Sequence, residues 1–558
     1  MAFNSRLGVR LCACVSALSL MTGCAISPSP YTAEEKSAQS SADMIDMFKG
    51  GEPLTGPMTL SDAIARAIKY NLDRRSRVME QALALGQLDV DSFELLPKLA
   101  ANAGYSERSQ NTASGSRDLY SQANSTSAPS YSSDRWSKTY DLTMSWNILD
   151  FGLTYYTAKS NADRALIANE RRRKASQNLI TDVRFAFWRA AAYQYLKSDV
   201  DQLVKEVQTA LEQSRAVENE NLRSPVDALR YQKSLLETVR QLILIQQELS
   251  TASLELAALI NVPPGTDIVL TMPEVMVPPS WDMPLDKMEE VAFVRNPDIA
   301  EQSYLSRIAV DDTRKAIIRL LPGITFSAGD NGDLNKFLIY KNWYETGAKL
   351  SWNLVNLASG PTILAQSDAN EAITKQRRLA VRMAVLAQVN ISERQFRNAV
   401  NQFNQATEVW KVDSRLAELI DARANNLASG TLERVAAHAT TIADQLRRFQ
   451  AYAQSEQAYG KIQATLGWDL LPETVPTTDI HELSSQIANR INRLDSVEPV
   501  SEKPQVPVSS VSETTGSKDR DDDIFTRFTR WFGAYVAPSH SDVASNTSQN
   551  RDAEKSGM

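Results

Sequence analysis

The side chains that most often carry out chemistry are few in this chain. The three histidines are His438, His481 and His540, and none stands at the spacing of a metal-ligand pair. The sequence contains neither a glycine-rich phosphate-binding loop nor a nucleophile elbow. It therefore predicts no catalytic residue, no metal site and no cofactor, and it indicates a protein that is not an enzyme.

The cysteines all lie within residues 1–24. There Arg6 and Arg10 precede an apolar stretch, as they do in a secretory signal sequence. The stretch ends in Met-Thr-Gly-Cys, which resembles the bacterial lipobox and implies cleavage before Cys24 and lipidation of that residue. Ala25, where an inner-membrane protein would carry Asp, favours the outer membrane by the same resemblance. An ordinary signal peptide with an incidental cysteine is the alternative.

Composition excludes several classes of protein. The 558 residues are 43% hydrophobic and 23% charged, with a formal net charge of -7, so electrostatics gives no support to a nucleic-acid partner. Beyond residue 24 no apolar run approaches the roughly 18 to 20 residues that a transmembrane helix needs. A chain of this kind that crosses a membrane would do so with strands.

The chain contains two copies of one pattern. Residues 60–105 align with residues 285–330 without a gap, and the triplet Ser-Trp-Asn occurs at 145–147 and again at 351–353. The first copy carries one longer loop, residues 107–134, which is rich in Ser, Asn and Thr, as solvated surface loops are. We therefore expect two structural repeats.

Each copy predicts a β-hairpin after a Leu-Leu-Pro that ends a helix. Large apolar and small polar residues alternate over residues 136–147 and again over 344–353, which is the period of a strand with one apolar face. About ten residues is the length of a tilted membrane strand. The residues predicted to face the membrane are Tyr140, Leu142, Met144, Trp146, Tyr344, Leu350 and Trp352.

Shorter alternations precede these two segments, so the chain offers four strands. Four strands cannot close a barrel, and an open strand edge is not tolerated in lipid because its backbone groups lack partners. A membrane position therefore requires an oligomer. A soluble four-stranded sheet packed on a helix is the alternative.

Long helices follow the hairpins, at residues 153–221 and 361–427, and shorter helices return at 225–261 and 431–466. The shorter helix that opens the first copy spans about 71–96. Apolar residues at Leu196, Val200, Leu203 and Val207, and leucines at 235, 242, 249 and 256, have coiled-coil spacing. The two short helices of a copy together match its long helix in length, so we expect them to stack end to end beside it.

Strand hairpins inserted in paired long helices, duplicated behind a signal sequence, resemble the TolC family of outer-membrane channel proteins. The local matches are "MTLSDAIARAIKYN", "WNILDFG" before the long helix and "NLRSPVDALRYQ" at its far end. The resemblance implies a mainly α fold with a small membrane β portion. It also implies a homotrimer whose twelve-stranded β-barrel continues as an α-helical periplasmic tunnel.

The same resemblance gives roles to the helix tips, which would contact a periplasmic adaptor protein and form a closed aperture. The adaptor-contacting residues would be Leu222, Arg223, Ser224, Pro225, Leu427, Ala428, Ser429 and Gly430. The possible aperture charges are Glu218, Asp227, Asp421, Arg423 and Glu433. Helix capping by Ser224 and Pro225, and simple solvation of the charges, are the alternatives.

The predicted organisation has six parts. They are a lipoprotein signal peptide (1–23), an N-terminal linker (24–57), a first repeat (58–265), an inter-repeat linker (266–284), a second repeat (285–472) and a low-complexity tail (473–558) with a short amphipathic helix at 521–536. The basic run at 171–174 is interpreted as a solvated helix face, with a basic belt in the tunnel as the alternative.

The predicted function is that of a lipid-anchored outer-membrane channel of a Gram-negative bacterium. It would be the exit duct of an export system with an adaptor and an inner-membrane ABC or proton-driven pump. The segment Leu-Ser-Asp-Ala-Ile-Ala-Arg-Ala resembles the protein-secretion members, which slightly favours type I secretion over efflux. A lipid-anchored coiled-coil scaffold or adhesin without a pore is the alternative.

Overall fold

The computed structural model describes residues 29–54, 56–114, 119–121, 130–219, 225–273, 275–424, 431–471 and 479–496. All of them belong to the first of two units, Met1–Ser496 and Val497–Met558. The predicted signal peptide, Cys24 and the predicted helix at 521–536 lie outside the described residues. None of the helices in the described part of the chain combines the length and apolar character needed to span a membrane.

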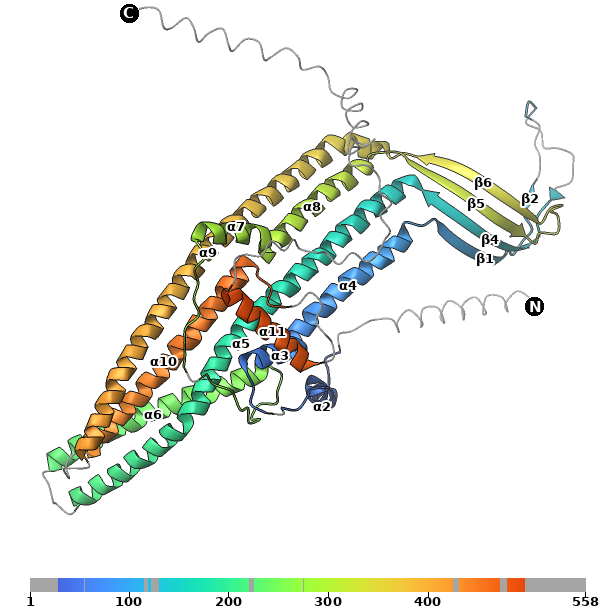
Figure 1. Ribbon diagram of the computed structural model, residues 1–558. Helices are drawn as coiled ribbons and strands as arrows, with labels where there is room; N and C mark the ends of the chain where they lie inside the picture. Colours follow the sequence, from blue (N-terminus) through green and yellow to red (C-terminus); the bar gives the residue numbers. More distant parts are fainter. Residues whose placement is uncertain are drawn as a thin grey trace, which may run out of the picture. The chain divides into compact units, whose positions relative to one another are not determined.

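The two predicted repeats have the same order of elements (Figure 1). The first contains α3 (Leu60–Tyr70), α4 (Leu72–Glu94), β1 (Lys98–Glu107), β4 (Trp136–Asn147), α5 (Ile148–Asn219) and α6 (Pro225–Leu259). The second contains α7 (Leu285–Arg295), α8 (Pro297–Ile318), β5 (Gly323–Asp333), β6 (Asn342–Ser351), α9 (Leu354–Ala424) and α10 (Thr431–Leu466). The remaining elements are α2 (Ala33–Phe48), the two-residue strands β2 (Ala113–Ser114) and β3 (Ser130–Tyr131), and α11 (Ile480–Ser496).

Two equivalent asparagines join the short helices end to end, as the helix lengths predicted. Asn71 caps the start of α4 and donates its side-chain amide to the carbonyl of Leu259, at the end of α6, over 3.2 Å. Asn296 caps α8 and donates in the same way to the carbonyl of Thr465 in the last turn of α10, over 2.8 Å. Each asparagine therefore satisfies free backbone groups of two helices at once.

Coiled-coil seams hold the long helices together. Leu196, Val200, Leu203 and Val207 of α5 are all at most 4% exposed. They form two apolar clusters with Leu235, Leu242 and Ile245 of α6 and with the α10 segment from 435 to 449. The predicted heptad pattern therefore marks the buried face of α5, and hydrophobic burial along this face stabilises the helical layer.

The long helices begin earlier than predicted. α5 starts directly after β4, and α9 starts at Leu354 with Pro361 inside it. A proline within a helix removes one backbone hydrogen bond, yet α9 continues beyond Pro361 to Ala424. The predicted start at residue 361 therefore falls inside the helix.

The predicted low-complexity tail is wrong for residues 480–496, which form α11. Leu483 and Ile487 of this helix are fully buried in the cluster that contains α3, and Ser484 donates to the carboxylate of Asp62. Ile480, Leu483, Ile487 and Ile491 have helical spacing that composition alone concealed. The predicted N-terminal linker also contains a helix, α2, which opens with a capping box between Thr32 and Glu35.

The basic run at 171–174 lies on a partly exposed helix face, and three of its cations form ion pairs within the chain. Arg171 binds Glu301 and Lys174 binds Asp298, both over 2.7 Å, so two of its residues tie α5 to α8. Arg173 binds Glu170 and Asp469. These cations are neutralised within the chain, and their role is to fix the two repeats against each other.

Candidate functional site

The sheet joins the hairpins of the two repeats in the order β1-β4-β5-β6, with every pair antiparallel. Residues paired across strands lie on the same face. Met144, for example, pairs with Leu99 on one side and with Ala328 on the other. The period-two pattern of each strand therefore adds up to one largely apolar face, which Lys138 and Asp330 interrupt, and one polar face.

The apolar face is exposed. It carries Tyr140, Leu142, Met144 and Trp146 of β4, which are between 38% and 48% exposed, together with Tyr344 and Leu350 of β6. The helix in most extensive contact with the sheet is α5, which meets β4 and β5 where β4 runs into it. Figure 1 shows the strands extending beyond the helix ends. The alternative of a sheet packed on a helix is therefore wrong.

The polar face is held by side-chain hydrogen bonds. Asn102 donates to Asp141 over 2.8 Å, and Asn147 donates to the hydroxyl of Thr325 over 3.0 Å. Two faces of such different polarity, both open, fit two different surroundings, one of lipid and one of water.

The two Ser-Trp-Asn triplets lie at the step from strand to long helix. Asn147 accepts from the backbone amides of Leu149 and Asp150, and Asn353 accepts in the same way from Val355 and Asn356, so both asparagines cap the helix that follows.

The tryptophans of the triplets are fixed at the same step. The ring of Trp146 packs edge-on against Phe151 with 5.7 Å between centroids. Trp352 lies one residue beyond β6, and its indole donates to the carbonyl of Leu320 over 3.0 Å. Both rings remain partly exposed, so they suit the level at which amphipathic rings meet headgroups.

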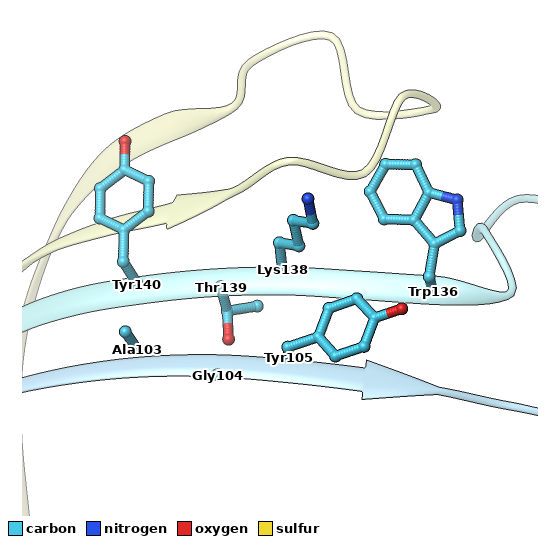
Figure 2. Close-up of a pocket in the computed structure, with 7 residues that line it drawn as sticks. All are labelled: Ala103, Gly104, Tyr105, Trp136, Lys138, Thr139 and Tyr140. Atoms are coloured by element: carbon cyan, nitrogen blue, oxygen red, sulfur yellow. The ribbon is translucent and has the colours of Figure 1, made fainter.

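A hollow of about 770 Å³ lies at the other end of the apolar face, on β1 and β4. Figure 2 shows Trp136, Lys138 and Tyr140 rising from β4 on the same side, with Tyr105 beside them on β1. The floor contains the backbone of Gly104 and Ala103, whose methyl group is small and leaves the space open. In the sequence, Lys138 only interrupts the apolar alternation of β4.

The sheet and the two layers of helices end at the same two edges, which are free because none of the described strands or helices extends a layer beyond them. β1 and β6 are the outer strands of the sheet. Next to the sheet the helices contact one another in the order α4-α5-α8-α9, and further along in the order α6-α5-α10-α9. One edge therefore consists of β1, α4 and α6, and the other consists of β6 and α9.

Apolar stripes at coiled-coil spacing run along these free edges. Each stripe consists of exposed side chains, and no described element of the chain covers it. The stripes are Met79, Leu83, Val90 and Phe93 on α4, Leu229, Leu236 and Ile243 on α6, and Val409, Val412, Leu416 and Leu419 on α9. Spacings of three, four and seven residues could have revealed them from the sequence, had the buried stripe of each helix been assigned first.

The predicted tip residues fall mostly outside the described residues. Leu222, Arg223, Ser224, Leu427, Ala428, Ser429 and Gly430 are among these, and Pro225 is the first residue of α6. Their role therefore stays a prediction.

The aperture charges lie on helix ends beside these tips. Glu218 accepts a 2.6 Å hydrogen bond from Gln232, and Asp421 contacts His438 over 3.1 Å, so both are held within their own chain. Asp227, Arg423 and Glu433 are exposed. Two of the five predicted aperture charges are therefore paired acids, and the other three are exposed.

A pair of acids lies further along the α9–α10 seam. Burial raises the pKa of Asp444, and a hydrogen bond with Asp413 raises it further, against the opposing effect of Arg447. Arg447 contacts Asp444 over 2.8 Å. The raised pKa means that Asp444 binds its proton more firmly than an ordinary aspartate does.

Comparison with solved structures agrees with this architecture. The chain is similar to the CmeC outer membrane channel of Campylobacter jejuni, with a TM-score of 0.58 and 12% identity over 76% of this chain and 89% of that one. It has the fold of the outer-membrane channel proteins. The outer membrane protein VceC of Vibrio cholerae has this fold too, with a TM-score of 0.54 and 12% identity over 73% of this chain and 96% of VceC.

A structure of CusC matches with a TM-score of 0.57 and 14% identity, over 75% of this chain and 96% of that one. No family model and no curated protein sequence matches the chain. The predicted fold class, with duplicated long helices and two hairpins per chain, is confirmed, and the resemblance to TolC-type channels holds at the level of the fold.

Proposed function

We propose that the chain is one subunit of a homotrimeric channel in the outer membrane of a Gram-negative bacterium. The observation that carries this proposal is the pair of free edges, which recurs in the sheet and in both helical layers. Strand edges in lipid need partners, and apolar helix stripes are stabilised by burial. Copies of the chain that join β6 to β1 and α9 to α4 and α6 satisfy all three layers at once.

Three copies of a four-stranded sheet make a twelve-stranded barrel. Its apolar face would meet lipid and its polar face would line a water-filled lumen. The long helices would continue this lumen into the periplasm as a tunnel. A lipid chain on Cys24 would add a second attachment to the outer membrane.

The helix tips would contact a periplasmic adaptor and restrict the aperture. Arg423, Asp227 and Glu433 are exposed near the tips, and in a trimer each would form a ring of three charges. We expect Arg423→Ala to raise single-channel conductance because it removes such a ring. Asp421→Ala would act differently, by releasing His438 of the same chain. Unchanged conductance in Arg423→Ala would remove Arg423 from the aperture.

The channel would be the exit duct for an inner-membrane ABC or proton-driven pump. For the cargo, the support is the opening segment of the first repeat, residues 60–67, which resembles that of channels for type I protein secretion. Efflux of small molecules is the second candidate. Crosslinking in cells, followed by identification of the adaptor and pump that co-purify, distinguishes the two.

Conductance of the purified full chain in planar bilayers tests the proposal itself. We expect a stable open-channel current from trimers. A folded chain that stays monomeric in detergent and does not conduct would instead be a lipid-anchored scaffold or adhesin.

A further inference from the structure

We propose that the hollow on β1 and β4 binds the phosphate-bearing headgroup of an outer-leaflet lipid, with Lys138 as the residue that contacts the phosphate. This inference rests on the proposed function, because it places the apolar face of the sheet against lipid. The hollow is lined by aromatic rings and by residues without bulky side chains, and it holds one cation.

A lysine on an apolar face is energetically unfavourable unless its ammonium group has an anionic partner. Lys138 interrupts the run of apolar residues on β4, and its register partner is Tyr105. Among the described residues, no carboxylate lies within 4 Å of its ammonium group. The neighbouring cations differ, since Arg135 lies 3.4 Å from Glu107 and Lys336 lies 2.9 Å from Asp134.

The height of Lys138 along the strand matches a headgroup. From Trp146, at the helix end of β4, to Lys138 the strand rises about 27 Å at ~3.4 Å per residue. A strand tilted by about 40° covers about 20 Å of membrane thickness over that length, and the apolar band of such barrels is about 25 Å tall. Lys138 would therefore lie close to the outer boundary of this band, where a lysine is tolerated and phosphates are present.

The walls of the hollow suit the rest of a lipid. The ammonium group of Lys138 lies 5.6 Å from the centre of the Trp136 ring, which orients it by a cation–π interaction. Ala101 and Ala103 continue the floor of small apolar side chains along β1 toward the membrane centre, where an acyl chain would lie. The hydroxyl of Tyr105 donates to Glu107, and that of Tyr140 donates to Asn342, so both rings are held in place at the rim.

Native mass spectrometry of the purified full-chain trimer tests the site, with diphosphoryl lipid A as the probe and phosphatidylcholine as the reference lipid. We expect the wild type to retain lipid A in preference to phosphatidylcholine. Lys138→Gln should weaken lipid A binding by about tenfold, because it removes a charge-assisted hydrogen bond. Lys349→Gln is the matched control, since Lys349 is an exposed lysine on the polar face of β6 and should leave binding unchanged.

A second variant tests the floor of the hollow, and a competitor tests whether the site binds a lipid or a free anion. Ala103→Leu fills the floor of the hollow and should also weaken lipid A binding, with Lys138 intact. Inorganic phosphate at millimolar concentration should not displace the lipid; displacement would show a free-anion site and overturn the lipid assignment. Equal binding of lipid A by the wild type and Lys138→Gln, or equal binding of the two lipids by the wild type, would also overturn it.

Conductance of the same preparations separates the two proposals. A wild type that conducts but shows no preference for lipid A overturns the lipid site alone. A wild type that binds lipid A through Lys138 without conducting overturns the channel and leaves the site as a membrane-contact surface. A wild type that does neither overturns both.

Discussion

The free edge of α9 gives the sharpest test of how copies of this chain assemble. Val412 is 66% exposed in the single chain and belongs to the stripe on that edge. Full burial of a valine contributes about 1.5 kcal/mol, so covering the remaining two thirds contributes about 1 kcal/mol per interface. Val412→Asp removes this contribution and buries an unpaired carboxylate, which costs about 2 kcal/mol more.

The expected loss is therefore about 3 kcal/mol per interface, or roughly 9 kcal/mol for a trimer with three such interfaces. The ratio of trimer to monomer depends on the square of the free monomer concentration. The protein concentration at which half of the chains are assembled should therefore rise by roughly a thousandfold. Mass photometry and light scattering of detergent-purified protein over a dilution series measure this shift directly.

Val277→Asp is the matched control. Val277 is 67% exposed, but it lies in the linker over the middle of the helical layer, where its carbonyl accepts from Tyr452 of α10. The same substitution there should leave assembly unchanged. If Val412→Asp assembled at the wild-type concentration, or if Val277→Asp impaired assembly equally, the α9 stripe would not be a subunit interface.

Three further predictions concern stability. Asn353→Ala should lower the free energy of unfolding by about 1 kcal/mol, because it removes the cap of α9. Asn353→Asp should retain the cap, and equal thermal midpoints for the two variants would contradict the capping role. Glu456→Ala leaves the guanidinium of Arg184, whose side chain is 2% exposed, without its 3.0 Å partner, and should cost about 3 to 5 kcal/mol in denaturant unfolding. Glu408→Ala, in an exposed pair, should cost less than about 1 kcal/mol, and similar losses for both would contradict this account. Because the pKa of Asp444 is raised in the folded chain, its contribution to stability is complete below the ordinary value of 3.8 and is lost as pH rises through the folded pKa. The free energy of unfolding, measured from pH 3 to pH 8, should show a decline that Asp444→Asn lacks. Identical pH profiles for the wild type and the variant would contradict the raised pKa of Asp444.

Local pattern was sufficient for most elements. The segment 136–147 was predicted as a strand and is β4 with the same bounds, and 431–466 was predicted as a helix and is α10. Both have a strong period and clear ends. One error occurred at α11, where composition replaced the period as the guide, and another at the start of α9, which was predicted at residue 361 and is at Leu354.

Only part of the candidate site could be predicted from the sequence. Alternation placed Tyr140, Leu142 and Trp146 on one face, and the structure shows that face open. The hollow around Lys138 was missed, because it needs Ala103 and Gly104 of another strand beside β4. The roles of the helix tips came from resemblance and still await the conductance and crosslinking experiments above.

Two copies of a hairpin between long helices could be predicted without the structure, because periodicity, proline breaks and asparagine caps act within a few residues of one another. Which segments contact one another is visible only in the folded chain. It pairs β4 with β5, distant in the chain, and it turns the basic run into ion pairs with α8. It also shows that both layers of helices and the sheet end at the same two edges. Such contacts depend on register and on geometry between distant segments, which no local period records.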